Sequence, residues 1–137
     1  MRTLSEIEIV DCLDASALNT AEASLPLLDD DRPGVSGWIG RGVAKGFYNA
    51  SSIQYEGIGV ATLIWSRTFD PDRVLNINAV ASIVDTDIAD IIQAAVVKLA
   101  KAQDCTIIEF HTRRPGMVAK TKRYDYKLHS VVLRKYL

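Results

Sequence analysis

The chain has 137 residues, of which 48% are hydrophobic and 24% charged, as in an ordinary soluble globular protein. This composition excludes a disordered chain, a coiled coil and a collagen-like repeat. No run approaches the roughly 18 apolar residues that a membrane span needs. Acidic residues between Met1 and Leu13 interrupt the place where a secretory signal would be apolar. We expect one domain over residues 1–137, located in the cytoplasm, without membrane contact.

Charge is distributed unevenly, although the formal net charge is only −1. Residues 1–31 contain eight acids against Arg2, a net charge of −7, and residues 111–137 contain eight bases against Asp125, a net charge of +7. Such asymmetry bears on association and surface potential rather than on fold. Either the two ends lie near each other and partly neutralise, or the basic end takes an anionic partner.

The first third of the chain predicts a strand followed by helical segments. Ile7–Cys12 alternates acidic and apolar residues, which is typical of a half-buried strand. A helix follows from Asp14 or Ser16 to Pro26, since apolar residues recur there at helical spacing. Leu28–Gly34 is a loop, and a short helix weakened by glycines runs from Trp38 to Phe47. Its Gly-x-Gly-x-x-x-Gly spacing follows no strand, so a dinucleotide loop is not indicated.

The middle of the chain predicts three consecutive antiparallel strands. These are Ser51–Tyr55, Ile58–Ser66 and Val74–Ile83, all rich in strand-forming residues. Glu56-Gly57 provides the first turn and Asp70-Pro71-Asp72 the second.

A helix from Asp87 to Ala102 carries one apolar stripe and is the clearest element of the sequence, with Asp85, Thr86 or Asp87 as its cap. It precedes a buried strand at Cys105–Phe110, a second helix at Gly116–Arg123, and a final strand at Leu128–Leu137. The predicted order is β-α-α-β-β-β-α-β-α-β, an α/β (α+β) fold with one mixed sheet flanked by helices.

The second half of the chain resembles the GNAT (N-acetyltransferase) superfamily, and most closely the short GNAT-like proteins of tailed bacteriophages. The resemblance covers Ile58 to Leu137 and rests on the element order and on two short segments. They are His111-Thr112-Arg113-Arg114-Pro115-Gly116-Met117 and Lys122-Arg123-Tyr124-Asp125-Tyr126-Lys127. It implies a GNAT-like fold for the whole chain.

GNAT enzymes hold the acetyl-CoA diphosphate on backbone N–H groups at the start of the long helix, in a glycine-rich turn. The corresponding segment here, Ser82–Asp87, has no glycine and contains Asp85 and Asp87. Each carboxylate beside a phosphate would cost on the order of 4 kcal/mol at about 4 Å and an effective dielectric constant near 20. The same carboxylates can cap the N–H groups that phosphates would need. We therefore expect no cofactor, with acetyl-CoA as the alternative.

The family's catalytic acid is also missing at its expected position. The resemblance places a tyrosine four residues before the glycine of a tight corner, and here those positions are Thr121 and Asp125. Asp tolerates the left-handed backbone that glycine would supply. Tyr124 and Tyr126 flank the corner, and we expect them to pack rather than to transfer protons. Cys105 is expected to be a small core residue, and His111 and His129 are not expected to bind a metal.

Three functions follow as hypotheses. The first is a GNAT-fold protein of phage type without acetyl-CoA chemistry, which binds protein partners as a virion-associated or host-interacting accessory. Such a protein would be found in the host cytoplasm or in the virion. Its partners would be phage structural proteins or further copies of itself.

The second hypothesis is an N-acyltransferase that moves an acetyl group from acetyl-CoA to an amine. Glu109 would be the general base, and Asn78, Ala79 and Val80, in the edge Asn76–Ala81, would hold the pantetheine arm by backbone hydrogen bonds. A solvent-facing carboxylate near Arg113 is the alternative interpretation of Glu109.

The third hypothesis is an accessory protein that binds nucleic acid through the basic segment. The same cations could bind another anionic surface, such as the acidic N-terminal part of a second copy. The candidate anion-binding or partner-binding residues are Arg113, Arg114, Lys120, Lys122 and Arg123.

Overall fold

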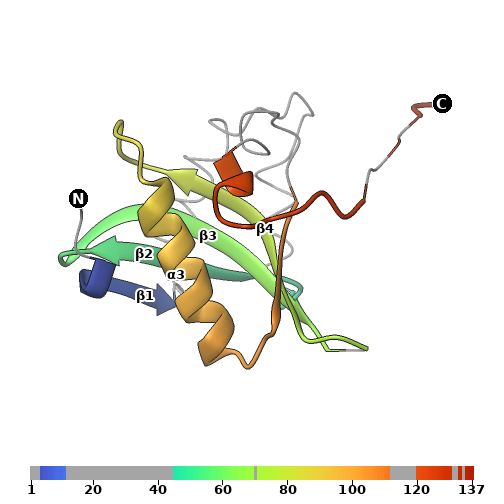
Figure 1. Ribbon diagram of the computed structural model, residues 1–137, viewed down its shortest axis with the longest axis horizontal. Coiled ribbons are helices and arrows are strands. Elements are labelled where there is room, and N and C mark those ends of the chain that lie inside the picture. Colours follow the sequence, from blue (N-terminus) through green and yellow to red (C-terminus); the bar gives the residue numbers. More distant parts are fainter. Residues whose placement is uncertain (1–3, 12–44, 70, 112–119, 131–132, 134) are drawn as a thin grey trace.

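The computed structural model describes residues 4–11, 45–69, 71–111, 120–130, 133 and 135–137. They form one five-stranded sheet in the order β1-β2-β3-β4-β5, crossed by one long helix (Figure 1). The chain begins with a short 3-10 turn, η1 (Leu4–Glu6). The strands are β1 (Ile7–Asp11), β2 (Asn49–Tyr55), β3 (Ile58–Thr68), β4 (Val74–Ser82) and β5 (Ile107–Phe110), and the helix is α3 (Ala89–Ala102).

Strands β1 to β4 pair antiparallel, whereas β5 pairs parallel to β4. A parallel pair needs a crossover connection, and α3 provides it. The β2–β3 hairpin turns at Glu56 and Gly57, which both have positive φ values, 53° and 79°. Two positive φ values match the tight turns that suit the twist of a hairpin.

The core lies between α3 and one face of the sheet. The buried side of α3 presents Ile91, Ala95, Val96 and Leu99, which cluster with Leu75 and other apolar side chains of the strands. A polar tie adds to this packing, because Lys98 Nζ donates to the carbonyl of Ile7 at 2.8 Å. Burial of the apolar stripe therefore fixes α3 across the strands.

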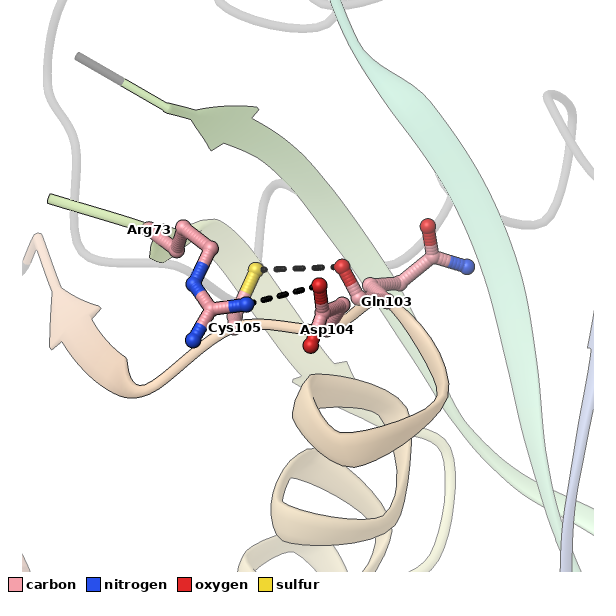
Figure 2. A network of polar contacts seen from close by, with 4 residues as sticks. All are labelled: Arg73, Gln103, Asp104 and Cys105. Carbon is pink, nitrogen blue, oxygen red and sulfur yellow. Dashed lines mark hydrogen bonds and ion pairs between the residues drawn. The ribbon is translucent and has the colours of Figure 1, made fainter.

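The end of α3 is held by a compact set of local contacts (Figure 2). The Cys105 N–H donates to the carbonyl of Ala100, and Asp104 takes a positive φ of 57°. The carboxylate of Asp104 forms an exposed ion pair with Arg73 at 2.7 Å. The Cys105 thiol is buried and lies 3.7 Å from the carbonyl oxygen of Gln103. The expected core role of Cys105 is confirmed.

The antiparallel meander and the long helix were predicted correctly, with shifted boundaries. β2 begins at Asn49 rather than Ser51, and β3 continues to Thr68 because its pairing with β4 extends to Val74. Helix α3 begins at Ala89, with Ile88 in the N-cap position. The Asp87 side chain, one of the three expected caps, accepts from the Ala89 N–H at 3.0 Å. β5 begins at Ile107 instead of Cys105.

Three other expected elements have different outcomes. The strand predicted over Leu128–Leu137 was wrong for the described residues, since none of them is in a strand. Of the helix predicted over Gly116–Arg123, the described part is helical only from Lys120 to Lys122. Both early helices, Cys12 and Trp38 lie outside the described residues.

Within the described part of the chain, no helix has the length and apolarity to cross a membrane.

We predict that Leu75→Ala lowers the free energy of unfolding by about 2–5 kcal/mol, because it leaves a cavity in a closely packed core. Leu75 is 0% exposed and lies in the cluster beneath α3. Leu128→Ala is the matched control, since Leu128 is 71% exposed and loses little on truncation. Urea denaturation of both variants measures the difference. Equal losses would contradict the assigned core.

Candidate functional site

The sheet opens between β4 and β5 partway along β4. Their parallel pairing covers Val74–Ile77 and Ile107–Phe110, and the last bond runs from the His111 N–H to the Ile77 carbonyl at 3.1 Å. Strand β4 continues to Ser82. On the β5 side of this continuation, no strand of the described part pairs with β4.

A bulge marks the point of opening. Ile64 of β3 pairs with Ala79 and Trp65 pairs with Ile77, so Asn78 is the extra residue of β4. A bulge bends its strand and disrupts the ladder locally. The bent end of β4 therefore lies beside the start of α3, with a space between them.

This space is a cavity of about 240 Å³. Its walls are the last residues of β4, the β4–α3 loop with the first turn of α3, Phe110 of β5, and the segment that begins at Lys120. Apolar side chains dominate these walls, with a few polar groups at separate points. Such a composition is typical of small-molecule sites. The lining residues are Val80, Ala81, Ser82, Val84, Thr86, Asp87, Ile88, Ala89, Ile92, Gln93, Phe110, Lys120, Thr121 and Tyr124.

In the loop before α3, side chains of the chain itself form hydrogen bonds with backbone groups. Asp87 Oδ1 accepts a hydrogen bond from the Ala89 N–H at 3.0 Å, which uses one of the first free amides of the helix. Ser82 Oγ accepts from the Val84 N–H at 3.2 Å and donates to the Val84 carbonyl at 2.9 Å. A negative charge thus stands at the positive end of the helix dipole, inside the cavity wall.

The far wall is formed by the corner at Asp125. This residue has a φ of 67°, so the expected left-handed conformation is confirmed. The Tyr124 N–H bonds to the carbonyl of Thr121 at 2.9 Å, which turns the chain sharply. Thr121 and Tyr124 both line the cavity, so Tyr124, which was expected to pack, forms part of the cavity wall.

Tyr126 packs behind this wall, as expected. Its ring meets that of Phe110 edge to face, with centroids 5.2 Å apart and planes at 87°. Its hydroxyl is buried and has no hydrogen-bond partner of good geometry in the described part of the chain. Burial raises the pKa of Tyr126, and the nearby Gln93 side chain opposes that rise in part.

Glu109 lies on the other face of the sheet from the cavity. Ile108 and Phe110 pack against the core, so the residues that alternate with them face away from α3. The carboxylate of Glu109 lies 3.7 Å from His111 Nε2. Asn76 is its neighbour in the register, and Asn78 Oδ1 accepts from Ser66 Oγ at 3.0 Å on the same face.

The remaining candidates are spread out. Val80 and Lys120 line the cavity, whereas Lys122 and Arg123 do not, and all three cations are exposed. Arg113 and Arg114 lie outside the described residues. Among the described residues, no group of three His, Cys, Asp or Glu side chains could hold a metal ion. Sequence reasoning missed Gln93 and Phe110 as lining residues, because only the parallel crossover brings α3 and β5 to the end of β4.

Comparison with known proteins identifies the fold. No family model matches the sequence, and no curated protein matches it. Solved structures do match over nearly the whole chain. A possible acetyltransferase from Clostridium difficile 630 aligns with a TM-score of 0.67 at 11% identity, covering 97% of this chain and 98% of that one.

A second match is the aminoglycoside N-acetyltransferase AAC(6')-Iy in complex with CoA, with a TM-score of 0.67 at 12% identity over 95% and 94% of the two chains. A ribosomal-protein-alanine N-acetyltransferase from Brucella melitensis biovar Abortus 2308 gives 0.64 at 16% identity over 94% and 99%. The chain has the GNAT fold. At these identities the likeness shows the fold alone. None of these three neighbours is named as a phage protein, so kinship with phage proteins gains no support and remains a prediction.

We predict that Tyr126→Phe leaves the melting temperature at neutral pH unchanged or slightly higher, since it removes a buried hydroxyl without a good partner. Because the folded state raises the pKa of Tyr126 above its ordinary 10.0, the native protein loses stability as the pH rises above 10. The variant should lose less stability there. Burial also raises the pKa of Tyr48 and Cys105, so some alkaline loss persists.

Melting curves from pH 7 to pH 11 measure both effects. A clearly lower melting temperature for Tyr126→Phe at neutral pH would show that the hydroxyl is bonded. Identical alkaline profiles would show that its titration does not contribute.

Proposed function

We propose that this GNAT-fold chain acts by binding and does not use acetyl-CoA as a GNAT enzyme does. The observation that supports this most is the hydrogen bond from the Ala89 N–H to the Asp87 carboxylate at 3.0 Å. Backbone amides at a helix start attract phosphates because they are free donors beside the positive dipole end. Here a carboxylate occupies one such donor and brings its own negative charge.

Two further features support the proposal. The β4–α3 loop contains no glycine, so its backbone is shielded by side chains from close approach of a diphosphate. Thr121 stands where the resemblance places a catalytic tyrosine, and a threonine hydroxyl is a far weaker acid. The resemblance to short phage proteins makes virion and host proteins the partner class to test first. In that setting the chain would be a virion-associated or host-interacting accessory.

The cavity favours a second candidate, an N-acyltransferase. It lies between the open end of β4 and the start of α3, where the edge containing Asn78, Ala79 and Val80 could hold a pantetheine arm. The Glu109 carboxylate, beside His111, would then take the amine proton from the opposite face through the opening. The basic segment leaves nucleic-acid binding as a third candidate, for which a steep fall of affinity with salt would be diagnostic.

We expect acetyl-CoA at millimolar concentration to leave the melting temperature of the native chain unchanged. A ligand that binds only the folded form must raise that temperature. Thermal denaturation with and without acetyl-CoA is the measurement. A clear, saturable rise would contradict the proposal and favour the acyltransferase.

The double variant Asp85→Asn, Asp87→Asn should be compared with the native chain in the same thermal denaturation with acetyl-CoA. Asparagine keeps an acceptor for the Ala89 N–H but removes the charge. Even a quarter of the roughly 4 kcal/mol estimated for each carboxylate would weaken binding about fivefold. If the carboxylates exclude the diphosphate, the variant gains a thermal shift. Asp72→Asn, in the β3–β4 connection, is the control.

Acetyl transfer tests the second candidate directly. We expect the native chain and Glu109→Gln to release CoA from acetyl-CoA at the same background rate with amine acceptors. Gln keeps the size of the side chain and removes its basicity. A rate above background in the native chain that falls at least about tenfold in Glu109→Gln would establish the enzyme.

A further inference from the structure

We propose that the cavity beside α3 binds small, uncharged aromatic compounds with one hydrogen-bonding group, such as a carboxamide, and that the Gln93 side chain binds that group. The inference deepens the proposed function by naming a class of ligand for this site. It rests on the proposed function, since it requires a cavity that acetyl-CoA does not occupy.

The charged groups of the cavity wall are exposed to solvent, whereas its buried part is uncharged. Among the described lining residues, Asp87 and Lys120 carry charge, and both are exposed. The lining residues that are buried or half-buried, from Val80 and Ala81 to Tyr124, are all uncharged. An ionised group that enters an apolar interior without a partner loses its hydration at a high cost. The buried part of the cavity therefore favours a ligand without charge.

The volume of the cavity suits a single ring with a short substituent. An apolar cavity of about 150 Å³ holds benzene. The cavity here measures about 240 Å³, which leaves room for roughly three or four more non-hydrogen atoms. A benzene ring with one carboxamide group is a molecule of this size.

Aromatic side chains in the wall favour a ring over an alkyl chain. Phe110 lines the cavity from β5, and Tyr124 lines it from the corner at Asp125. The Phe110 ring is held by its edge-to-face contact with Tyr126, with 5.2 Å between the centroids. Aromatic rings that meet offset or edge to face gain more than the burial of their area provides. Because the Phe110 ring is already held, binding of a ligand ring costs little ordering of the protein.

Gln93 is the side chain best suited to bind the polar group of such a ligand. It is half-buried on α3 and lines the cavity. Its side chain lies close to the Tyr126 hydroxyl, since it opposes the rise in the pKa of that group. A side-chain amide has two N–H donors and an acceptor oxygen, which is more than one phenol can use. A ligand carboxamide can therefore donate to Gln93 and accept from it.

NMR titration of the full native chain with benzamide tests the proposal. We expect saturable chemical-shift changes in the first turns of α3, with a dissociation constant on the order of 1 mM for a ligand of this size. Benzoate and benzylamine, which are charged at neutral pH, should bind at least about tenfold more weakly. Toluene has no hydrogen-bonding group, so its binding should not depend on Gln93.

The variant Gln93→Leu keeps the size of the side chain and removes its hydrogen-bonding groups. It should weaken benzamide binding at least about fivefold. Toluene binding should stay unchanged, which shows that the cavity of the variant is intact. Gln54→Leu is the matched control, because Gln54 is half-buried on β2 and is not a lining residue of the cavity. This variant should bind benzamide like the native chain.

The absence of saturable benzamide binding up to ~10 mM overturns the proposal. Benzamide binding that Gln93→Leu leaves unchanged overturns it too, as does equally tight binding of either charged analogue. A separate titration with acetyl-CoA distinguishes the failures. A saturable response to acetyl-CoA contradicts the proposed function and this inference with it, whereas no binding of either compound overturns this inference alone.

Discussion

The parallel crossover of α3 from β4 to β5 is the constraint on which the rest of the structure depends. Burial of the apolar stripe that includes Ile91 and Leu99 holds the helix across the sheet. This sets the first turn of α3 beside the free end of β4 and sets β5 along only its first half. The bulge at Asn78 bends the strand at the same point. The cavity is therefore a consequence of topology, and its chemistry depends on which residues line it.

That chemistry differs from what a diphosphate needs. A scaffold shared with CoA-binding proteins brings a helix start, a loop and a bent strand together. In this chain the Val84 N–H donates to Ser82 Oγ and the Ala89 N–H donates to Asp87 Oδ1. The same fold can support ligand binding without acetyl transfer, because the fold sets the positions of the site residues while the sequence sets their chemistry. Under the proposed function, the carboxylate at the start of α3 is the feature that distinguishes binding without acetyl-CoA from acyl transfer.

Local patterns were enough to predict the meander and the long helix. The runs of strand-forming residues in β2 to β4 and the regular apolar spacing of α3 depend on near neighbours in the sequence. The strand predicted over Leu128–Leu137 was wrong for the described residues, because strand-forming residues also need a partner edge to pair with. Gln93 and Phe110 could not be assigned to the cavity, since long-range packing brings them there. The left-handed backbone of Asp125 was predictable because a positive φ depends on the residue type at that one position.

The central claim is that carboxylates of the chain keep a coenzyme diphosphate from the start of α3. Nitrogen–proton NMR correlation spectra during a titration with CoA test it most directly, because the Ala89 amide reports on its own hydrogen bond. The account predicts that this resonance stays in place up to millimolar CoA. A saturable movement of the Ala89 signal together with those of its neighbours in the first turn would contradict it.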